Sequence, residues 1–191
     1  MMEDQDTLRV IYVPAGEMTD AMRADKHALQ VACFADVPAE EIFDYFVAEP
    51  IGSVLAWYRN EMVGCVSVFK RTITFEERPV TLGGYGGTCT REDLRGQGIG
   101  SRVCGVAMDT LHAEGCEIAM LAVDKDGSTN RFYERQGYRV LGRSFEIVTG
   151  KGQRVAPDDV AMIAPVRSEE IFQQVLASRQ PLFLGPDRGY W

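Results

Sequence analysis

The stretch Glu92–Leu111, EDLRGQGIGSRVCGVAMDTL, places three glycines, Gly96, Gly98 and Gly100, where a helical pattern begins. The apolar residues of this stretch recur at intervals near 3.6, which is typical of a helix with one buried face; they are Ile99, Val103, Val106, Ala107 and Leu111. Glycine costs a helix about 1 kcal/mol relative to alanine. Three glycines at a helix start therefore need an explanation.

Three explanations compete for these glycines. A loose linker is disfavoured, because the glycines join two strongly patterned segments directly. Binding of a phosphate is favoured, since a helix N-terminus has unpaired N–H groups and a partial positive charge, and glycine lets an anion approach the backbone. Arg95 and Arg102 add positive charge on either side. Tight packing of the helix on a strand is the third explanation.

Neither common nucleotide motif is present in this stretch. There is no G-K-[ST], so a Walker loop is excluded, and the spacing G-x-G-x-G differs from the dinucleotide fingerprint G-x-G-x-x-G. The phosphate, if bound, is therefore expected to belong to another kind of ligand.

Composition narrows the functional class. The chain has 191 residues, 46% hydrophobic and 25% charged, which suits one globular domain. A net charge of −8 argues against nucleic acid; it suits a cationic substrate, or simply aids solubility. The N-terminus lacks signal-peptide features, and no apolar run approaches the ~20 residues of a membrane span. We therefore expect a cytoplasmic protein without membrane contact.

Metal and triad chemistry are not expected. The five cysteines form no C-x-x-C pair and lie in apolar segments, which indicates reduced core thiols. The two histidines, His27 and His112, have no second metal ligand nearby in the sequence, and there is no G-x-S-x-G stretch.

Strand and helix patterns alternate along the chain, which predicts an α/β arrangement around a mixed sheet. Strands are expected at 7–15, at 53–75 as a hairpin across Arg59-Asn60-Glu61, and at 78–90, 116–123, 139–148 and 160–166. Helices are expected at about 19–33, within 36–48, after Gly98, within 128–138 and at 168–179. A polar loop at 149–159 and a tail at 180–191 complete the chain.

Two motifs together resemble one family. Arg95–Gly100, RGQGIG, resembles the R/Q-x-x-G-x-G/A signature of GCN5-related N-acetyltransferases (GNAT), and Asn130–Tyr138, NRFYERQGY, is similar to their N-x-F-Y-E-x-x-G-F/Y segment. The resemblance covers about residues 55–150. It implies a GNAT fold, with a mixed, mostly antiparallel sheet of about seven strands flanked by helices. It also implies acetyl-CoA-dependent acylation of a small amine, in a domain spanning 1–167 that is completed by 168–191.

The resemblance also assigns residues to acetyl-CoA. Backbone N–H groups of the loop are expected to hold the pyrophosphate: Arg95, Gly96, Gln97, Gly98, Ile99, Gly100 and Ser101. The strand end Thr88-Cys89-Thr90 is expected beside the pantetheine, in a slot made where that strand splays from Ala122-Val123, with Asn130 and Phe132 flanking the arm. Tyr133 occupies the position of the general acid, although a core aromatic is the alternative.

A closer resemblance concerns the acceptor. Residues 149–166, TGKGQRVAPDDVAMIAPV, and the terminal Gly-Tyr-Trp resemble aminoglycoside 2′-N-acetyltransferases. This implies a site for ammonium groups built from acidic groups, namely Asp36, Asp158, Asp159 and the carboxylate of Trp191, next to Tyr85 and Gly86. Those relatives carry a glutamate where Gly86 stands. The Trp191 carboxylate, acting through water, is the expected substitute base, and Asp124 a weaker one.

Other readings stay open. The acceptor of the same chemistry is alternatively a polyamine, an amino-acid derivative or a peptide. A non-catalytic acyl-CoA sensor is a rival of another class. Dimerisation is expected only by analogy with such enzymes.

Overall fold

The computed structural model describes residues 7–35, 45–125, 127 and 129–191. Within these residues, seven strands form the main sheet, in the order β1-β2-β3-β4-β5-β9-β6. Their bounds are β1 Arg9–Pro14, β2 Gly52–Tyr58, β3 Glu61–Phe75, β4 Arg78–Thr90, β5 Ile118–Val123, β9 Val160–Pro165 and β6 Arg139–Val140. All neighbours are antiparallel except β4 and β5, which are parallel. The expected mixed, mostly antiparallel sheet is confirmed.

A second, smaller sheet corrects the sequence interpretation. It has the order β10-β7-β8, with bounds Leu182–Arg188, Phe145–Val148 and Arg154–Val155. The single strand expected at 139–148 is two strands in different sheets, because Gly142, at φ 71°, lies at a bend between them. The polar loop at 149–159 contains β8. The tail at 180–191 contains β10, so the strand expected at 160–166 is not the last strand of the chain.

The helices begin and end close to their expected positions. They are α1 Asp20–Cys33, α3 Ile99–Ala113, α4 Asn130–Glu134 and α5 Glu169–Ala177. Thr19 caps α1 by accepting from the Met22 N–H, and Ser168 caps α5 by accepting from the Ile171 N–H. The helix expected within 36–48 falls largely outside the described residues, and 45–48 are not helical. No helix in the described part of the chain is long and apolar enough to cross a membrane.

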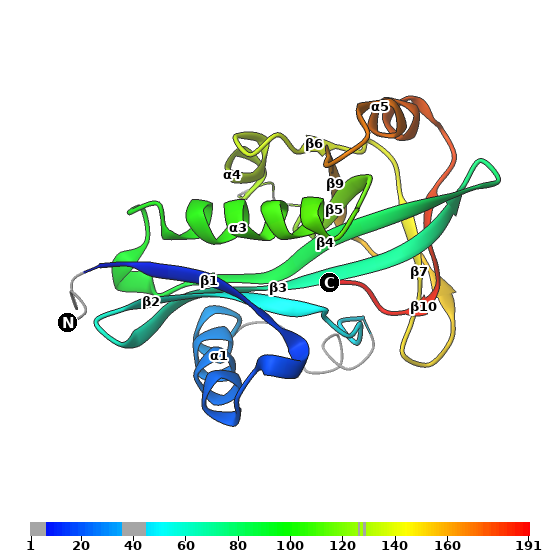
Figure 1. Ribbon diagram of the computed structural model, residues 1–191. Helices are drawn as coiled ribbons and strands as arrows, with labels where there is room; N and C mark the ends of the chain where they lie inside the picture. Colours follow the sequence, from blue (N-terminus) through cyan, green and yellow to red (C-terminus); the bar gives the residue numbers. More distant parts are fainter. Residues whose placement is uncertain (1–6, 36–44, 126, 128) are drawn as a thin grey trace.

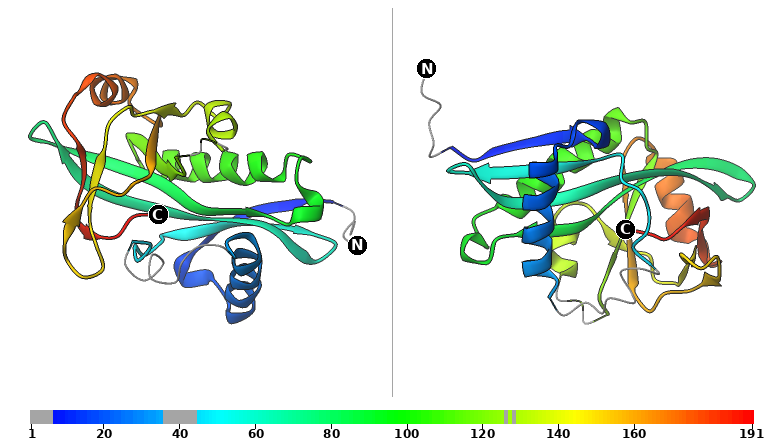
Figure 2. Two further views of the ribbon diagram at one scale, coloured as in Figure 1. Left: turned by 180° about the vertical axis from the view of Figure 1, so that it is seen from behind. Right: turned by 90° about the horizontal axis from the view of Figure 1, so that it is seen from below.

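The two faces of the main sheet carry different elements. Helices α3 and α4 lie on one side of it and α1 lies on the other (Figure 1). Seen from below, α1 and the C-terminus both lie in front of the sheet (Figure 2). The tail joins a core cluster that contains Leu184, Trp191 and, from β3, Phe69 and Ile73. Burial of these apolar side chains fixes the C-terminus against the middle of the sheet.

Candidate active site

The centre of the sheet opens between β4 and β5. Their parallel pairing runs from Leu82 opposite Ile118 to Gly84 opposite Met120 and stops there, although β4 continues to Thr90. Next to the opening, β4 carries one extra residue against β3, and Gly87 has φ 62°. Backbone groups of β4 that point towards β5 beyond Gly84 therefore have no strand partner on that side. This is the splay predicted from the sequence.

The glycine loop precedes α3 and has the geometry of an anion site. Gly96 has φ 78°, and Gly98, the N-cap of α3, has φ 82°. A Cβ atom at either position would meet nothing within 4 Å. The left-handed backbone, rather than lack of space, therefore requires glycine here. Gly100 differs, since its Cβ would contact the Phe132 ring and Thr90 Oγ1, both at 3.4 Å.

The first N–H groups of α3 are available to a ligand. No side chain caps this helix, and its first backbone bond runs from Arg102 N–H to Gly98 O. Residues 96–98 and Ser101 are exposed. A helix N-terminus with free, exposed donors stabilises a bound anion.

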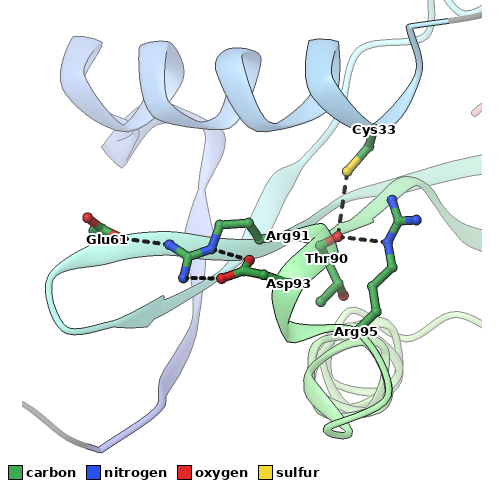
Figure 3. A network of polar contacts seen from close by, with 6 residues as sticks. All are labelled: Cys33, Glu61, Thr90, Arg91, Asp93 and Arg95. Carbon is green, nitrogen blue, oxygen red and sulfur yellow. Dashed lines mark hydrogen bonds and ion pairs between the residues drawn. The ribbon is translucent and has the colours of Figure 1, made fainter.

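A polar network fixes the entry to this loop (Figure 3). Arg91 pairs with Glu61 at 2.6 Å and with Asp93 at 2.7 Å. The Thr90 carbonyl accepts from Arg95 Nε at 3.3 Å and from the Cys33 thiol at 3.7 Å. The Arg95 side chain, expected as a charge flanking the loop, is thus turned back towards the end of β4, and its backbone N–H, expected at the pyrophosphate, donates to Glu92 O.

Tyr133 lies at the opening on the α4 side. Its hydroxyl donates to Thr88 Oγ1 at 3.4 Å, and its ring packs edge-on against Phe132 with centroids 4.9 Å apart. Burial raises the pKa of Tyr133 to about 12. The phenol therefore keeps its proton at neutral pH and is able to act as a proton donor.

Asn130 supplies the clearest test of whether an acetyl-CoA arm fits here. Its Oδ1 is buried and has no hydrogen-bond partner among the described residues. Leaving a buried acceptor unpaired costs about 1–3 kcal/mol, so a ligand donor at this point would be stabilising. The amide groups of a pantetheine arm provide such donors. An acetyl-CoA molecule therefore fits the residues present, which are those of the opening, the start of α3 with its unpaired N–H groups, and Asn130.

The C-terminus lies against the opposite face of β4. Trp191 Nε1 donates to Met120 O at 2.8 Å, and the indole stacks on Phe69 with centroids 5.4 Å apart. A Cβ on Gly86 would lie 2.5 Å from the carboxyl carbon of Trp191, and a Cβ on Gly84 would overlap the indole. The terminal carboxyl therefore fills the space that a side chain at position 86 would need.

Arg71 holds this tail in place and was not singled out from the sequence. Its Nη1 donates to the carbonyls of Leu184 at 3.2 Å and Gly189 at 3.1 Å, and its guanidinium lies over the Trp191 ring, 4.6 Å from the centroid. Burial lowers the pKa of Arg71. The sequence did contain a signal for Arg71. It occupies an inward position of β3, and the inward residues on either side of it, Phe69 and Ile73, are apolar.

The remaining predicted residues are more dispersed. Asp158 is exposed and pairs with Lys125, while Asp159 accepts from the Tyr190 hydroxyl. Burial, with Asp124 and Asp158 adding to it, raises the pKa of Asp159. Asp36 lies outside the described residues.

Two side chains of β4, those of Tyr85 and Cys89, are buried in the core. Tyr85, expected beside the acceptor, is buried on the α3 face against Tyr138, so the structure does not bring it to Gly86. The side chain of Cys89 is buried opposite Cys65, so only its backbone borders the opening. Among the described residues, no group of His, Cys, Asp or Glu side chains could hold a metal ion.

Comparison with known proteins identifies the family. Residues 18–138 match the model of the acetyltransferase (GNAT) family. The chain belongs to this family. As a GNAT protein it is an acetyl-CoA-dependent N-acetyltransferase. The match ends at Tyr138, before the tail that places the Trp191 carboxyl.

Solved structures agree with the GNAT fold. Escherichia coli ElaA is 14% identical, with a TM-score of 0.59 over 83% of this chain and 99% of that one. A chain of the NatC complex, solved with Gag peptide and CoA, is 18% identical, with a TM-score of 0.58 over 82% and 98%. A GNAT-family acetyltransferase from Staphylococcus aureus Mu50 is 12% identical, with a TM-score of 0.55 over 84% and 99%. The search of curated proteins found no match.

Proposed function

We propose that this GNAT protein acetylates a small amine held on the α1 face of the sheet, with the Trp191 carboxylate as general base and Tyr133 as general acid. The observation that carries the proposal is the position of the Trp191 carboxyl directly over Gly86. Tyr133 lies on the other face of the same strand, bonded to Thr88. A base on one side of the opening and an acid on the other suit amine attack on a thioester held between them.

The same geometry supports an assignment of residues to acetyl-CoA. The N–H groups from Gly96 to Ser101 would hold the pyrophosphate, and the backbone of Thr88, Cys89 and Thr90 would run beside the pantetheine. Asn130 would bond the arm, and Phe132 would flank it. Bound in this way, acetyl-CoA supplies the activated acetyl group.

The proposed chemistry needs two proton transfers and one acyl transfer. The Trp191 carboxylate removes a proton from the acceptor nitrogen, through a water molecule, as that nitrogen forms its bond to the thioester carbonyl carbon. The carbon–sulfur bond then breaks, and Tyr133 gives its proton to the leaving thiolate. N–H groups of the bulged part of β4 stabilise the oxyanion. Because the pKa of Tyr133 is raised to about 12, the acid stays protonated wherever the amine begins to be neutral.

The proposal leaves the chemical class of the acceptor amine to be identified by experiment. An aminoglycoside, the class suggested by residues 149–166, would need several anionic partners. Asp158 is paired with Lys125, and Asp159 is engaged by Tyr190. Among the described acidic groups, the Trp191 carboxylate is the one that lies directly over Gly86. We therefore favour a small amine with one reacting nitrogen as the acceptor, and we include an aminoglycoside among the amines to be tested.

Release of free CoA thiol tests the proposal. Acetyl-CoA is incubated with a panel that includes kanamycin, spermidine, free amino acids and peptide N-termini. Amine-dependent thiol release, with an acetylated amine found by mass spectrometry, is expected for at least one class. Tight CoA binding by calorimetry with no release from any amine would instead indicate the acyl-CoA sensor.

A further inference from the structure

Lys26 is a partly buried cation on the inner side of α1. Its Nζ donates to Ser53 Oγ at 3.0 Å and to Ser67 Oγ at 2.6 Å. Among the described residues, no ion pair includes Lys26, and it forms none with the terminal carboxylate. A partly buried ammonium gains from an anionic partner, because even partial removal of its charge from water is costly. Two neutral hydroxyls supply less than that.

Lys26 lies one strand away from the proposed base. Ser67 on β3 is directly opposite Gly86 on β4, and opposite residues of antiparallel strands share a face about 5 Å apart. The terminal carboxyl covers Gly86, whereas the Lys26 ammonium is bonded to Ser67. A positive group over β3 and a negative group over β4 therefore lie on neighbouring strands of the same face.

A pocket of about 160 Å³ opens beside this lysine. Its polar lining comes mainly from α1, as Arg23, Lys26, His27 and Gln30, with Ser53 from β2. None of the described residues that line it is acidic, in a chain of net charge −8. Gln30, which lines the pocket, also donates from its Nε2 to Gly87 O of β4 at 3.4 Å. The pocket therefore has a basic lining, opposite in sign to the net charge of the protein.

We propose that this pocket binds an anionic group of the acceptor, in the simplest case a carboxylate, so that the substrate is an amine that also carries an acid. The inference rests on the proposed function and adds to it the substrate class. The acceptor amine faces the Trp191 carboxylate, and its acid faces Lys26. Because Lys26 is bonded to Ser67 on β3 and the Trp191 carboxyl covers Gly86 on the adjacent β4, a compact amine that carries an acid, such as an amino acid, suits the two groups.

Matched acceptor pairs test this inference. Free amino acids are compared with their amides, and aminoalkyl phosphates with the corresponding amino alcohols, by kcat/KM for thiol release with acetyl-CoA. We expect the acid member to exceed its neutral partner by about tenfold or more. The carboxylate and phosphate arms show which acid the pocket prefers. Lys26→Met should abolish the preference, and Arg179→Met, which removes an exposed charge, should retain it.

The ratio within one variant decides the matter, because loss of folded enzyme lowers both members equally. Lys26→Arg, which keeps the charge, should restore part of the preference. Equal or better turnover of the neutral members by the wild type, or an unchanged ratio in Lys26→Met, would overturn the inference and leave the proposed function standing. No release from any pair, with release from another amine of the wider panel, would overturn the inference alone; no release from any amine at all would contradict the proposed function and the inference with it.

Discussion

At the scale of single residues, Tyr133 packs among aromatic side chains and is the proposed proton donor. Replacing it by phenylalanine removes the hydroxyl and keeps the ring packed against Phe132. We predict that Tyr133→Phe lowers kcat by about 100-fold, a typical contribution of a general acid. The affinity for acetyl-CoA, measured by calorimetry, should hardly change. Tyr138→Phe, in the same aromatic cluster, is the control and should turn over normally; equal kcat in the two variants would remove the acid role.

Gly86 is the second residue whose identity determines the site. A methyl group there would be 2.5 Å from the Trp191 carboxyl carbon, so Gly86→Ala must displace the C-terminus. We predict reduced kcat with unchanged acetyl-CoA affinity, as judged by thiol release and calorimetry. Gly105→Ala, where a Cβ meets nothing within 4 Å, should retain full activity. Normal turnover by Gly86→Ala would show that the carboxyl need not lie there.

The sequence anticipated part of this residue-scale picture. The RGQGIG and NRFYERQGY motifs led to the loop, Asn130 and Tyr133, because these residues are close together along the chain or belong to the family pattern. Arg71 and Lys26 were missed. Their partners, carbonyls of the tail and serines of β2 and β3, are distant in sequence, so only the fold reveals the contacts.

At the scale of elements, the N-terminus of α3 depends on the left-handed backbone of Gly98. A side chain at φ 82° costs about 1–2 kcal/mol, and relief of that strain would re-orient the free N–H groups. We predict that Gly98→Ala weakens acetyl-CoA binding, measured by calorimetry. Gly152→Ala carries the same strain at φ 84°, between β7 and β8, and should lose stability without losing affinity. If both variants bound equally well, the phosphate site would lie elsewhere.

Elements were predicted well where local pattern and burial agree. The caps of α1 and α5, the helical face of α3 and the buried strand β5 all follow from local sequence. The division of residues 139–148 between two sheets did not, because a single glycine at a left-handed bend separates two otherwise continuous apolar runs. Strand β10 was missed because its Pro and Gly resemble a loop, whereas its pairing with β7 is a long-range contact.

At the scale of the whole molecule, Arg71 ties the tail to the main sheet. Removing its guanidinium leaves the carbonyls of Leu184 and Gly189 without this donor. Each buried carbonyl left unpaired costs about 1–3 kcal/mol of stability. We predict that Arg71→Met lowers the unfolding temperature and also lowers kcat. Arg78→Met, which breaks an exposed pair with Glu117, should change stability by less than about 1 kcal/mol. Equal melting temperatures and rates would show that Arg71 does not hold the tail.

At this scale the tail brings Trp191 to the core beside the middle of the main sheet. From the sequence, the Trp191 carboxylate was predicted as a substitute for the missing glutamate only through resemblance. Its position over Gly86 depends on β10, the Arg71 contacts and the Phe69 stack, none of which local sequence specifies.

Adding one glycine after Trp191 tests the account most directly, since it moves the carboxylate and leaves every other side chain unchanged. The measurement is kcat for thiol release, alongside acetyl-CoA affinity and the unfolding temperature. We predict a fall in kcat of about 100-fold, with affinity and unfolding temperature near those of the wild type. A wild-type kcat in the extended chain would contradict the terminal carboxylate as the base.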